Sequence, residues 1–478
     1  MKQAVIVIHG MGEQIPMQTI MDFAETVWTT DSDLIDPARP DSTTGGAREK
    51  NAIWFKPDDR NRSYELRRLT TESLSGRSST DFYEFYWAHL MHGTAWEHFQ
   101  AWLIDLLWRS PRRVPRGLRA AWMVLWLITV VAAAGAATSL VPFEGKGWVW
   151  SVLTGLTTLG IAWFVNTCLL KYFGDVARYL KATPTNVARR QEIREKGVEL
   201  LETLMGIEPD GKQKKSEYDR IVVVAHSLGT IIAYDILSHC FARLNTRMQP
   251  VEDQPERVKL EEMIWAGAGL PYAADNASPT AILDVASFQA QQANCRMEIN
   301  AQGSPWIVSD FITLGSPLAH AEFLLAYDKA GLREAQDRRV LPTCPPTLEH
   351  DETTKRRHFT YRVARGAVAP RLPHHAALFA YTRWTNLYSP HSAILWGDII
   401  SGPVSPQFNL AVNGREISGI RDLAVLPERD EGGKTANSAS IPFFSHTKYW
   451  RYPGKWKIGV DVPHHIATLR QAINLKNG

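Results

Sequence analysis

The feature that most constrains the fold is a run of β-branched residues that passes through a turn into a helical pattern. The run is Ile-Val-Val-Val at 221–224, the turn is Ala-His-Ser-Leu-Gly at 225–229, and the pattern continues through 230–237. A short, continuously apolar strand of this kind is typical of the centre of a parallel sheet. We therefore expect a buried strand, a tight turn and a helix inside an α/β protein.

The rest of the chain alternates short strand patterns with helical ones, which predicts a mostly parallel, doubly wound sheet. Further strands are expected at 4–8, 82–87, 311–314 and 385–388, and helices at 17–28 and 183–205. The polar stretch 45–79 is expected to be loop, and 248–305 an irregular insertion.

Composition excludes several classes of protein. The chain has 478 residues, of which 45% are hydrophobic and 22% charged, as in globular proteins. Its net charge of +3 is too small to indicate a nucleic-acid partner. The four cysteines lack paired spacing, which argues against a disulfide framework or a zinc site. No metal-binding or phosphate-binding motif is found, so neither a metal nor a cofactor is expected.

Two segments, 120–143 and 148–170, contain no charged residue. Each is long enough for a helix to cross a hydrocarbon core of ~30 Å at ~1.5 Å per residue. The short linker between them predicts an antiparallel transmembrane hairpin. The alternatives are a helical pair buried in a soluble core and a hairpin that enters only one leaflet.

Positive charge lies on the outer flanks of these segments. Arg109, Arg112, Arg113, Arg116 and Arg119 precede the first, and Lys171, Arg178 and Lys181 follow the second. The positive-inside rule then places the rest of the chain in the cytoplasm. The first strand pattern is too short for a signal peptide, which agrees with this placement. The apolar spacing at 96–107 indicates a helix along the membrane surface or packed in the core.

These patterns predict a discontinuous domain. Residues 1–92 would form its first part, 93–182 an inserted amphipathic helix and transmembrane hairpin, and 183–478 the remainder, with the insertion at 245–305.

The turn at 225–229 carries a serine with a small residue two positions away on either side. This is the nucleophile-elbow pattern, with Ala225 at the place of the first glycine. The turn strains the serine, and the small neighbours let strand and helix approach each other. The helix N-terminus favours negative charge beside the serine. Ser227 is therefore the predicted nucleophile.

A glycine-rich loop, His-Gly-Met-Gly at 9–12, follows the first strand pattern. A serine hydrolase needs backbone N–H donors aimed at the oxyanion of its intermediate. One donor is expected from Leu228, next after the nucleophile, and the other from Met11 or Gly12. The alternative is a simple glycine-rich turn.

With these motifs the chain resembles lipase-like serine esterases of the α/β-hydrolase fold. Three later stretches carry the resemblance further: Thr-Leu-Gly-Ser-Pro-Leu at 313–318, Trp-Thr-Asn-Leu-Tyr at 384–388, which leads to Asp398, and Ser-His-Thr-Lys-Tyr-Trp at 445–450. The resemblance covers the sheet but neither the hairpin nor the insertion.

The resemblance implies that Asp398 is the catalytic acid and His446 the base, in the chain order that this fold uses. The sequence departs from the family pattern where Asp398 is followed by two isoleucines, and where Thr447 stands in place of the common serine. Asp310 is a competing acid, although it is expected to begin its strand. His464 and His465 are competing bases. Ser316 is interpreted as part of a structural turn.

The resulting hypothesis is a membrane-anchored hydrolase that cleaves carboxylic esters through an acyl-enzyme. A hairpin near the active site favours a lipid-like substrate taken from the bilayer, although it could also serve only to localise the enzyme. The alternatives are an acyltransferase or thioesterase with the same triad, and a non-catalytic membrane scaffold or effector. The sequence predicts no particular protein partner.

Overall fold

In the computed structural model of the chain, the described residues are 2–10, 15–36, 38–41, 44–61, 63–73, 79–91, 107–114, 118–119, 122–123, 126–127, 129–131, 179–180, 184–269, 282–364, 369–392, 396–412, 414–427, 445–452 and 462–476. The chain divides into two compact units. The first contains Met1–Gly10, Gln14–Tyr86 and Ile193–Gly478, and the second contains Met11–Glu13 and Trp87–Glu192.

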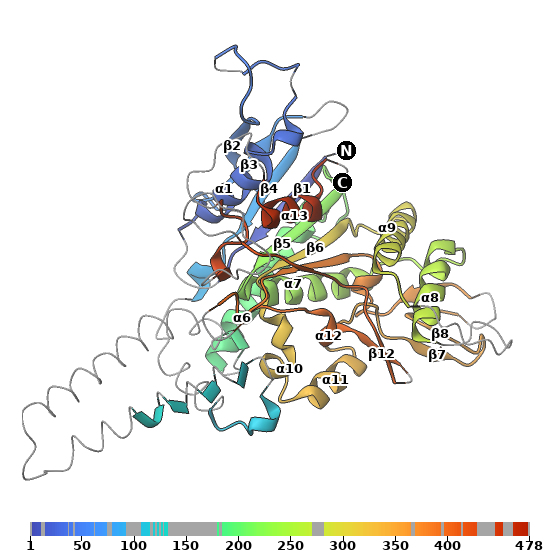
Figure 1. Cartoon of the computed structure of the whole chain (residues 1–478). Coiled ribbons are helices and arrows are strands. Elements are labelled where there is room, and N and C mark those ends of the chain that lie inside the picture. Colours follow the sequence, from blue (N-terminus) through green and yellow to red (C-terminus); the bar gives the residue numbers. More distant parts are fainter. Residues whose placement is uncertain are drawn as a thin grey trace, which may run out of the picture. The chain divides into compact units, whose positions relative to one another are not determined.

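An eight-stranded sheet forms the centre of the first unit, in the order β14-β11-β6-β5-β1-β4-β3-β2. Figure 1 labels the strands from β6 to β2. The strands from β14 to β4 are parallel, and β3 and β2 extend the sheet antiparallel. The bounds are β1 (Gln3–Ile8), β2 (Ile53–Pro57), β3 (Arg67–Thr71), β4 (Thr80–Phe85), β5 (Arg220–His226), β6 (Val308–Leu314), β11 (Arg383–Tyr388) and β14 (Arg421–Ala424).

Helices precede, follow and connect these strands. They are α1 (Gln18–Ala24), α6 (Pro184–Leu204), α7 (Leu228–Asn245), α8 (Pro255–Ala268), α9 (Val285–Ala301), α10 (Ala321–Leu324), α11 (Lys329–Asp337), α12 (Ser405–Phe408) and α13 (His464–Ile473). Three small antiparallel pairs are formed by β7 (Glu349–Asp351) with β8 (Arg356–His358), β9 (Thr360–Arg362) with β10 (Arg371–Pro373), and β12 (Leu410–Val412) with β13 (Arg415–Ile417).

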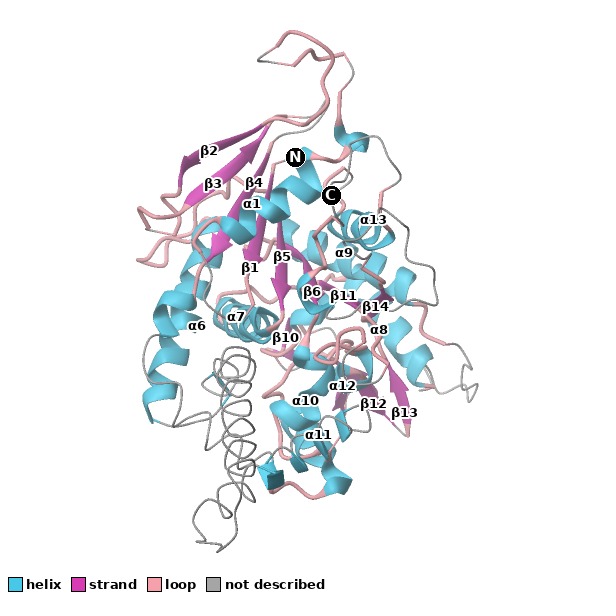
Figure 2. Ribbon diagram, turned by 60° about the vertical axis from the view of Figure 1, so that its left-hand side comes forward, coloured by secondary structure: helices cyan, strands magenta, loops and turns pink. Residues whose placement is uncertain are grey.

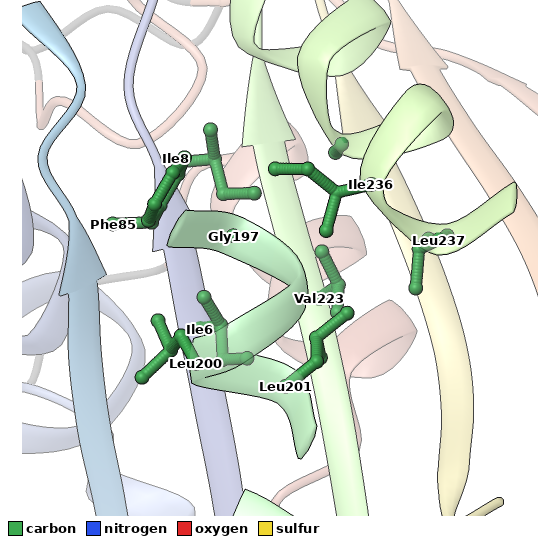
Figure 3. A pocket seen from close by; sticks show the side chains of 10 residues that line it. Ile6, Ile8, Phe85, Gly197, Leu200, Leu201, Val223, Ile236 and Leu237 are labelled. Carbon is green, nitrogen blue, oxygen red and sulfur yellow. The ribbon is translucent and has the colours of Figure 1, made fainter. Parts of the chain in front are cut away.

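Alternate residues of the central strands face opposite sides of the sheet, and both sides are covered (Figure 2). On one side, Val5 and Val222 share a buried core with residues of α1 and α13. On the other, Ile6 and Val223 line a small apolar cavity together with residues of α6 and α7 (Figure 3). Two-sided burial explains why these strands are continuously apolar in the sequence.

The parallel α/β class is therefore confirmed. The strands expected at 4–8, 221–224, 311–314 and 385–388 are found as β1, β5, β6 and β11. β1, β6 and β11 begin one to three residues earlier, β5 is longer at both ends, and 82–87 corresponds to β4, which begins and ends two residues earlier. The helix expected at 17–28 is α1, followed by a π-helical turn at Glu25–Thr29. Of the helix expected at 183–205, α6 covers Pro184–Leu204.

Two expectations were wrong. Residues 45–79 are not only loop, because they contain β2 and β3. β2 is the edge strand, and its apolar run, Ile-Trp-Phe at 53–55, is short, lies in an otherwise polar stretch and is largely exposed. The stretch 248–305 is not irregular, because it contains α8 and α9. Polar side chains such as Glu261 and Gln292 are buried in these helices, so the buried positions do not form a regular apolar pattern in the sequence.

Among the described residues, no helix is both long and apolar enough to cross a membrane. The two charge-free segments, 120–143 and 148–170, lie largely or wholly outside the described residues, as does the segment 96–107. The hairpin therefore stays a prediction from the sequence.

Candidate active site

Ser227 lies in the turn between β5 and α7 and is buried. Its backbone φ of 52° is positive, which residues other than glycine rarely adopt. The Ser227 N–H donates to the carbonyl of Leu314 at the end of β6, and its carbonyl accepts from Thr230. This strained turn is therefore held in place from both directions, as the elbow pattern predicts.

The loop after β1 lies against this turn, because β1 and β5 are paired with Ile8 opposite Ala225. A Cβ added to Gly10 would lie 2.8 Å from the Ser227 Cβ, and one added to Gly229 would lie 2.4 Å from the carbonyl oxygen of His9. Both positions therefore need glycine. The predicted oxyanion donors Met11 and Gly12, which come next, lie outside the described residues. Leu228, the other predicted donor, is the first residue of α7.

His446 contacts both other members of the predicted triad. Its Nε2 lies 2.8 Å from Ser227 Oγ, and its Nδ1 lies 2.9 Å from Asp398 Oδ2. An ionised carboxylate can only accept, so Nδ1 carries the proton and Nε2 is free to take one from the serine. Residues that are 219 and 48 positions apart in the sequence thus form one hydrogen-bonded chain.

Asp398 is buried on the loop that follows β11. Burial alone would raise the pKa of its carboxyl group. The charge of His446 and the hydrogen bonds from His446 and Tyr449 outweigh burial and hold the pKa of Asp398 well below its ordinary value. Its Oδ1 accepts from the backbone N–H of Ile400, which fixes the carboxylate on its own loop.

His226, the residue before the nucleophile, bonds to the segment that carries the base. Its Nε2 donates to the backbone carbonyl of His446 at 2.7 Å, and the two rings lie 4.9 Å apart. Burial, followed by the charge of His446, lowers the pKa of His226 to about 3. His226 is therefore a neutral donor that positions the base segment and does not compete for the proton.

The turn after β6 completes the site. Gly315 has a φ of +59°, and a Cβ there would lie 3.2 Å from both Asp398 Oδ2 and His446 Nδ1. Ser316 caps the short helical turn that follows by accepting from the Leu318 N–H, and its hydroxyl also bonds to Thr230 at the start of α7. Ser316 is thus a structural turn residue, as the sequence predicts.

The competing residues lie elsewhere in the fold. Asp310 lies on β6, where it is buried and paired with Arg220 and Arg383. His464 and His465 begin α13, and the His465 ring bonds to the carbonyl of Arg451. None of the three bonds to Ser227 in the described contacts.

Two of the histidines that stand in adjacent pairs, at 374–375 and 464–465, are not solvated. His374 and His465 are both buried. Burial lowers the pKa of His374 to about 3 and that of His465 to about 4, so both are neutral near pH 7. Within the described part of the chain, no group of three or more His, Cys, Asp or Glu side chains is arranged to hold a metal ion.

Two residues of the site were not assigned a role from the sequence, His226 and Tyr449. His226 directly precedes Ser227, and Tyr449 follows His446 by three residues, inside the motifs at 225–229 and 445–450. That nearness was the available signal, but it does not reveal which atom each one contacts.

Comparisons of the chain with protein-family models, with curated proteins and with solved structures find no match. A serine hydroxyl is bonded to a histidine that is oriented by a carboxylate, beside the N-terminus of a helix. This arrangement can deprotonate the hydroxyl during attack and favour negative charge next to it.

Proposed function

We propose that the protein is a serine hydrolase of the α/β-hydrolase fold that cleaves carboxylic esters through an acyl-enzyme. The observation that carries the proposal is the hydrogen-bonded chain from Ser227 Oγ through His446 to Asp398. Distances of 2.8 and 2.9 Å are those needed for a nucleophile, its base and the group that orients the base. The strained turn at Ser227 supports the same reading.

In the proposed reaction, Ser227 Oγ attacks the ester carbonyl carbon while its proton passes to His446 Nε2. Asp398 stabilises the imidazolium that forms. The oxyanion lies near the N-terminus of α7, where the N–H of Leu228 and a donor from Met11 or Gly12 would hold it. The imidazolium then protonates the leaving alcohol, and the acyl group stays on Ser227. Water, deprotonated by His446, releases the acid and restores the serine.

We further propose that the enzyme is anchored in a membrane by the hairpin at 120–143 and 148–170, with the catalytic unit on the cytoplasmic side. Support comes from the absence of charge in both segments and from the arginines before the first. Near its start, Met123, Leu127, Val130 and Val131 are exposed apolar residues spaced four, three and one apart. A lipid-like ester is the substrate that this location favours.

Ester hydrolysis by the full chain in detergent tests the proposed function. Wild type should release the carboxylic acid and the phenol from simple aryl esters, and Ser227→Ala should lose at least about a hundredfold in rate. Ser238→Ala is the matched control, because this serine lies on α7 and bonds only to the Tyr234 carbonyl among the contacts described. Equal activity of wild type and Ser227→Ala would refute the proposed mechanism.

The choice of substrate needs a separate comparison. Wild type should turn over phospholipid or acylglycerol esters held in vesicles faster than soluble short-chain esters. Equal turnover of the two classes would remove the support for a lipid substrate and leave the hydrolase intact. Added alcohol or amine acceptors that collect the acyl group ahead of water would indicate transfer in place of hydrolysis.

A further inference from the structure

Tyr449 is a fully buried residue whose hydroxyl group joins the segments that carry the acid and the base. The hydroxyl donates to Asp398 Oδ2 at 2.7 Å. It also accepts from the backbone N–H of Ser389 at 3.0 Å and lies 3.0 Å from Ser401 Oγ. A single hydroxyl thus connects the end of β11, the loop of Asp398 and the segment of His446.

The carboxylate oxygen that Tyr449 contacts is the one that His446 uses. Both Tyr449 and the Nδ1 of His446 bond to Oδ2, whereas Oδ1 takes the backbone N–H of Ile400. Hydrogen bonds to an ionised oxygen are among the stronger ones, and two donors on one oxygen share its charge. The tyrosine therefore limits how strongly Asp398 can hold a proton on His446.

Packing fixes the tyrosine independently of the triad. Its ring belongs to the core on the α1 and α13 side of the sheet. A Cβ added to Gly315 would lie 2.7 Å from Tyr449 Cε2, so the turn after β6 closes directly over the ring. The hydroxyl is presented to Asp398 by the fold itself.

We propose that Tyr449 is a positioning residue that sets the strength of the Asp398–His446 pair and thereby the pH at which the base becomes available. This inference rests on the proposed serine-hydrolase function. When the hydroxyl is removed, more of the Asp398 charge acts on the imidazolium, and His446 keeps its proton to a higher pH.

Other titratable groups surround the pair. The His226 ring lies 4.9 Å from that of His446, His320 bonds to the carbonyl of Ile399, and His9 and His391 lie on the loops before Gly10 and Asp398. Burial lowers the pKa of His226 to about 3 and that of His320 to about 4, so both stay neutral above pH 5. All four are unchanged in the variants below.

The test is the second-order rate constant for labelling by a fluorophosphonate, measured from about pH 5 to about pH 9. For Tyr449→Phe we expect the midpoint of the acidic limb to rise by about half a pH unit, which slows labelling about threefold below the midpoint. The rate on the alkaline plateau should be largely retained. A purely structural role would lower the plateau and the melting temperature without moving the midpoint.

Tyr452→Phe is the matched control, because it removes a hydroxyl from the same segment. That hydroxyl bonds to Thr30 and Arg470, away from Asp398. Its pH profile should match wild type. Ser401→Ala, which removes the other hydroxyl beside Tyr449, should shift the midpoint in the same direction by less, and it serves if Tyr449→Phe unfolds.

Two outcomes distinguish a failure of the proposed role of Tyr449 from a failure of the proposed hydrolase function. If wild type is labelled and neither Tyr449→Phe nor Ser401→Ala moves the midpoint, the inference is wrong and the hydrolase stands. If wild type is not labelled at any pH, the proposed function fails, and this inference fails with it.

Discussion

At the scale of single residues, the position of Ser227 depends on close contacts that only glycine permits. Gly10, in the loop after β1, closely approaches Ser227, and Gly229, in the first turn of α7, closely approaches the end of β1. The atoms that an added Cβ would meet at Gly229 are backbone carbonyl oxygens, which cannot move without moving β1.

Gly229→Ala should therefore displace the elbow. We expect activity to fall at least about tenfold and unfolding to become easier by about 1–3 kcal/mol, because overpacking forces the backbone apart. Thermal unfolding and ester hydrolysis measure the two effects. Gly46→Ala is the control, since its nearest neighbour is the end of the Thr44 side chain at 3.6 Å. Wild-type behaviour of Gly229→Ala would show that the contact is not tight.

Glu84 gives a prediction about pH. Its carboxyl group is buried on β4, accepts from the Met17 N–H at 2.7 Å, and has a second oxygen without a hydrogen bond. Burial raises its pKa from 4.5 to about 7. The pKa of Glu84 in the folded protein lies above its value of 4.5 in the unfolded chain. The folded protein is therefore most stable with respect to this group below about pH 4.5, and it loses that stability as the pH rises through about 7.

Glu84→Gln should remove this dependence. The free energy of unfolding is measured against pH for wild type and for Glu84→Gln. Between pH 5 and 8, wild type should lose on the order of 2 kcal/mol more than the variant. Denaturant titrations at several pH values measure it. Parallel curves for the two proteins would mean that Glu84 is ionised without cost.

The role of a single residue can be predicted from the sequence where the residue lies inside a recognisable motif. The turn motif predicts Ser227, the resemblance to serine esterases implies Asp398 and His446, and the three residues meet in the structure. The roles of Tyr449 and His226 depend on contacts with residues 51 and 220 positions away, which no local pattern contains.

At the scale of elements, α6 and α7 pack closely where Gly197 faces Ile236. A Cβ added to Gly197 would lie 2.2 Å from Ile236 Cδ1 and 2.7 Å from its Cγ1. This contact borders the small apolar cavity against β1 and β5 (Figure 3).

Gly197→Ala should cost about 1–3 kcal/mol of stability, and a second substitution, Ile236→Val, should recover part of that cost. Denaturant unfolding of the two single variants and the double variant measures the coupling. Simple additivity of the two single effects would contradict the close contact.

Elements were predictable in proportion to their burial. β1, β5 and β6 are buried on both faces, and their largely apolar runs predict them. β11 is also buried but contains Thr385 and Asn386, and it is predicted within a motif that carries the resemblance to serine esterases. β2 is not predicted, because its apolar run is only three residues long, at 53–55, and lies in a polar stretch. The helices α8 and α9 were missed because hydrogen bonds let them bury Arg257, Glu261 and Gln292.

At the scale of the whole molecule, the open prediction is membrane anchoring. The absence of charge in the segments 120–143 and 148–170 is read directly from the sequence. That they form two helices paired in a membrane stays a prediction. The full chain should remain with the membrane fraction after alkaline carbonate washing.

Charged residues placed in the first segment should weaken this retention. Leu127→Lys combined with Val130→Lys alters residues that are 62% and 54% exposed, and a lysine at the centre of a bilayer costs about 2.5–3.5 kcal/mol. Val340→Lys, at a 68% exposed apolar residue of the first unit, is the control. Release of wild type by the carbonate wash would contradict the anchor.

The central claim is that Ser227 is an activated nucleophile. Its most direct test is fluorophosphonate labelling of the detergent-solubilised full chain, read by intact mass and peptide mapping. We predict one adduct per chain, on Ser227, which is absent from Ser227→Ala and present in Ser238→Ala. No adduct on folded wild type, or an adduct that persists in Ser227→Ala, would contradict the account.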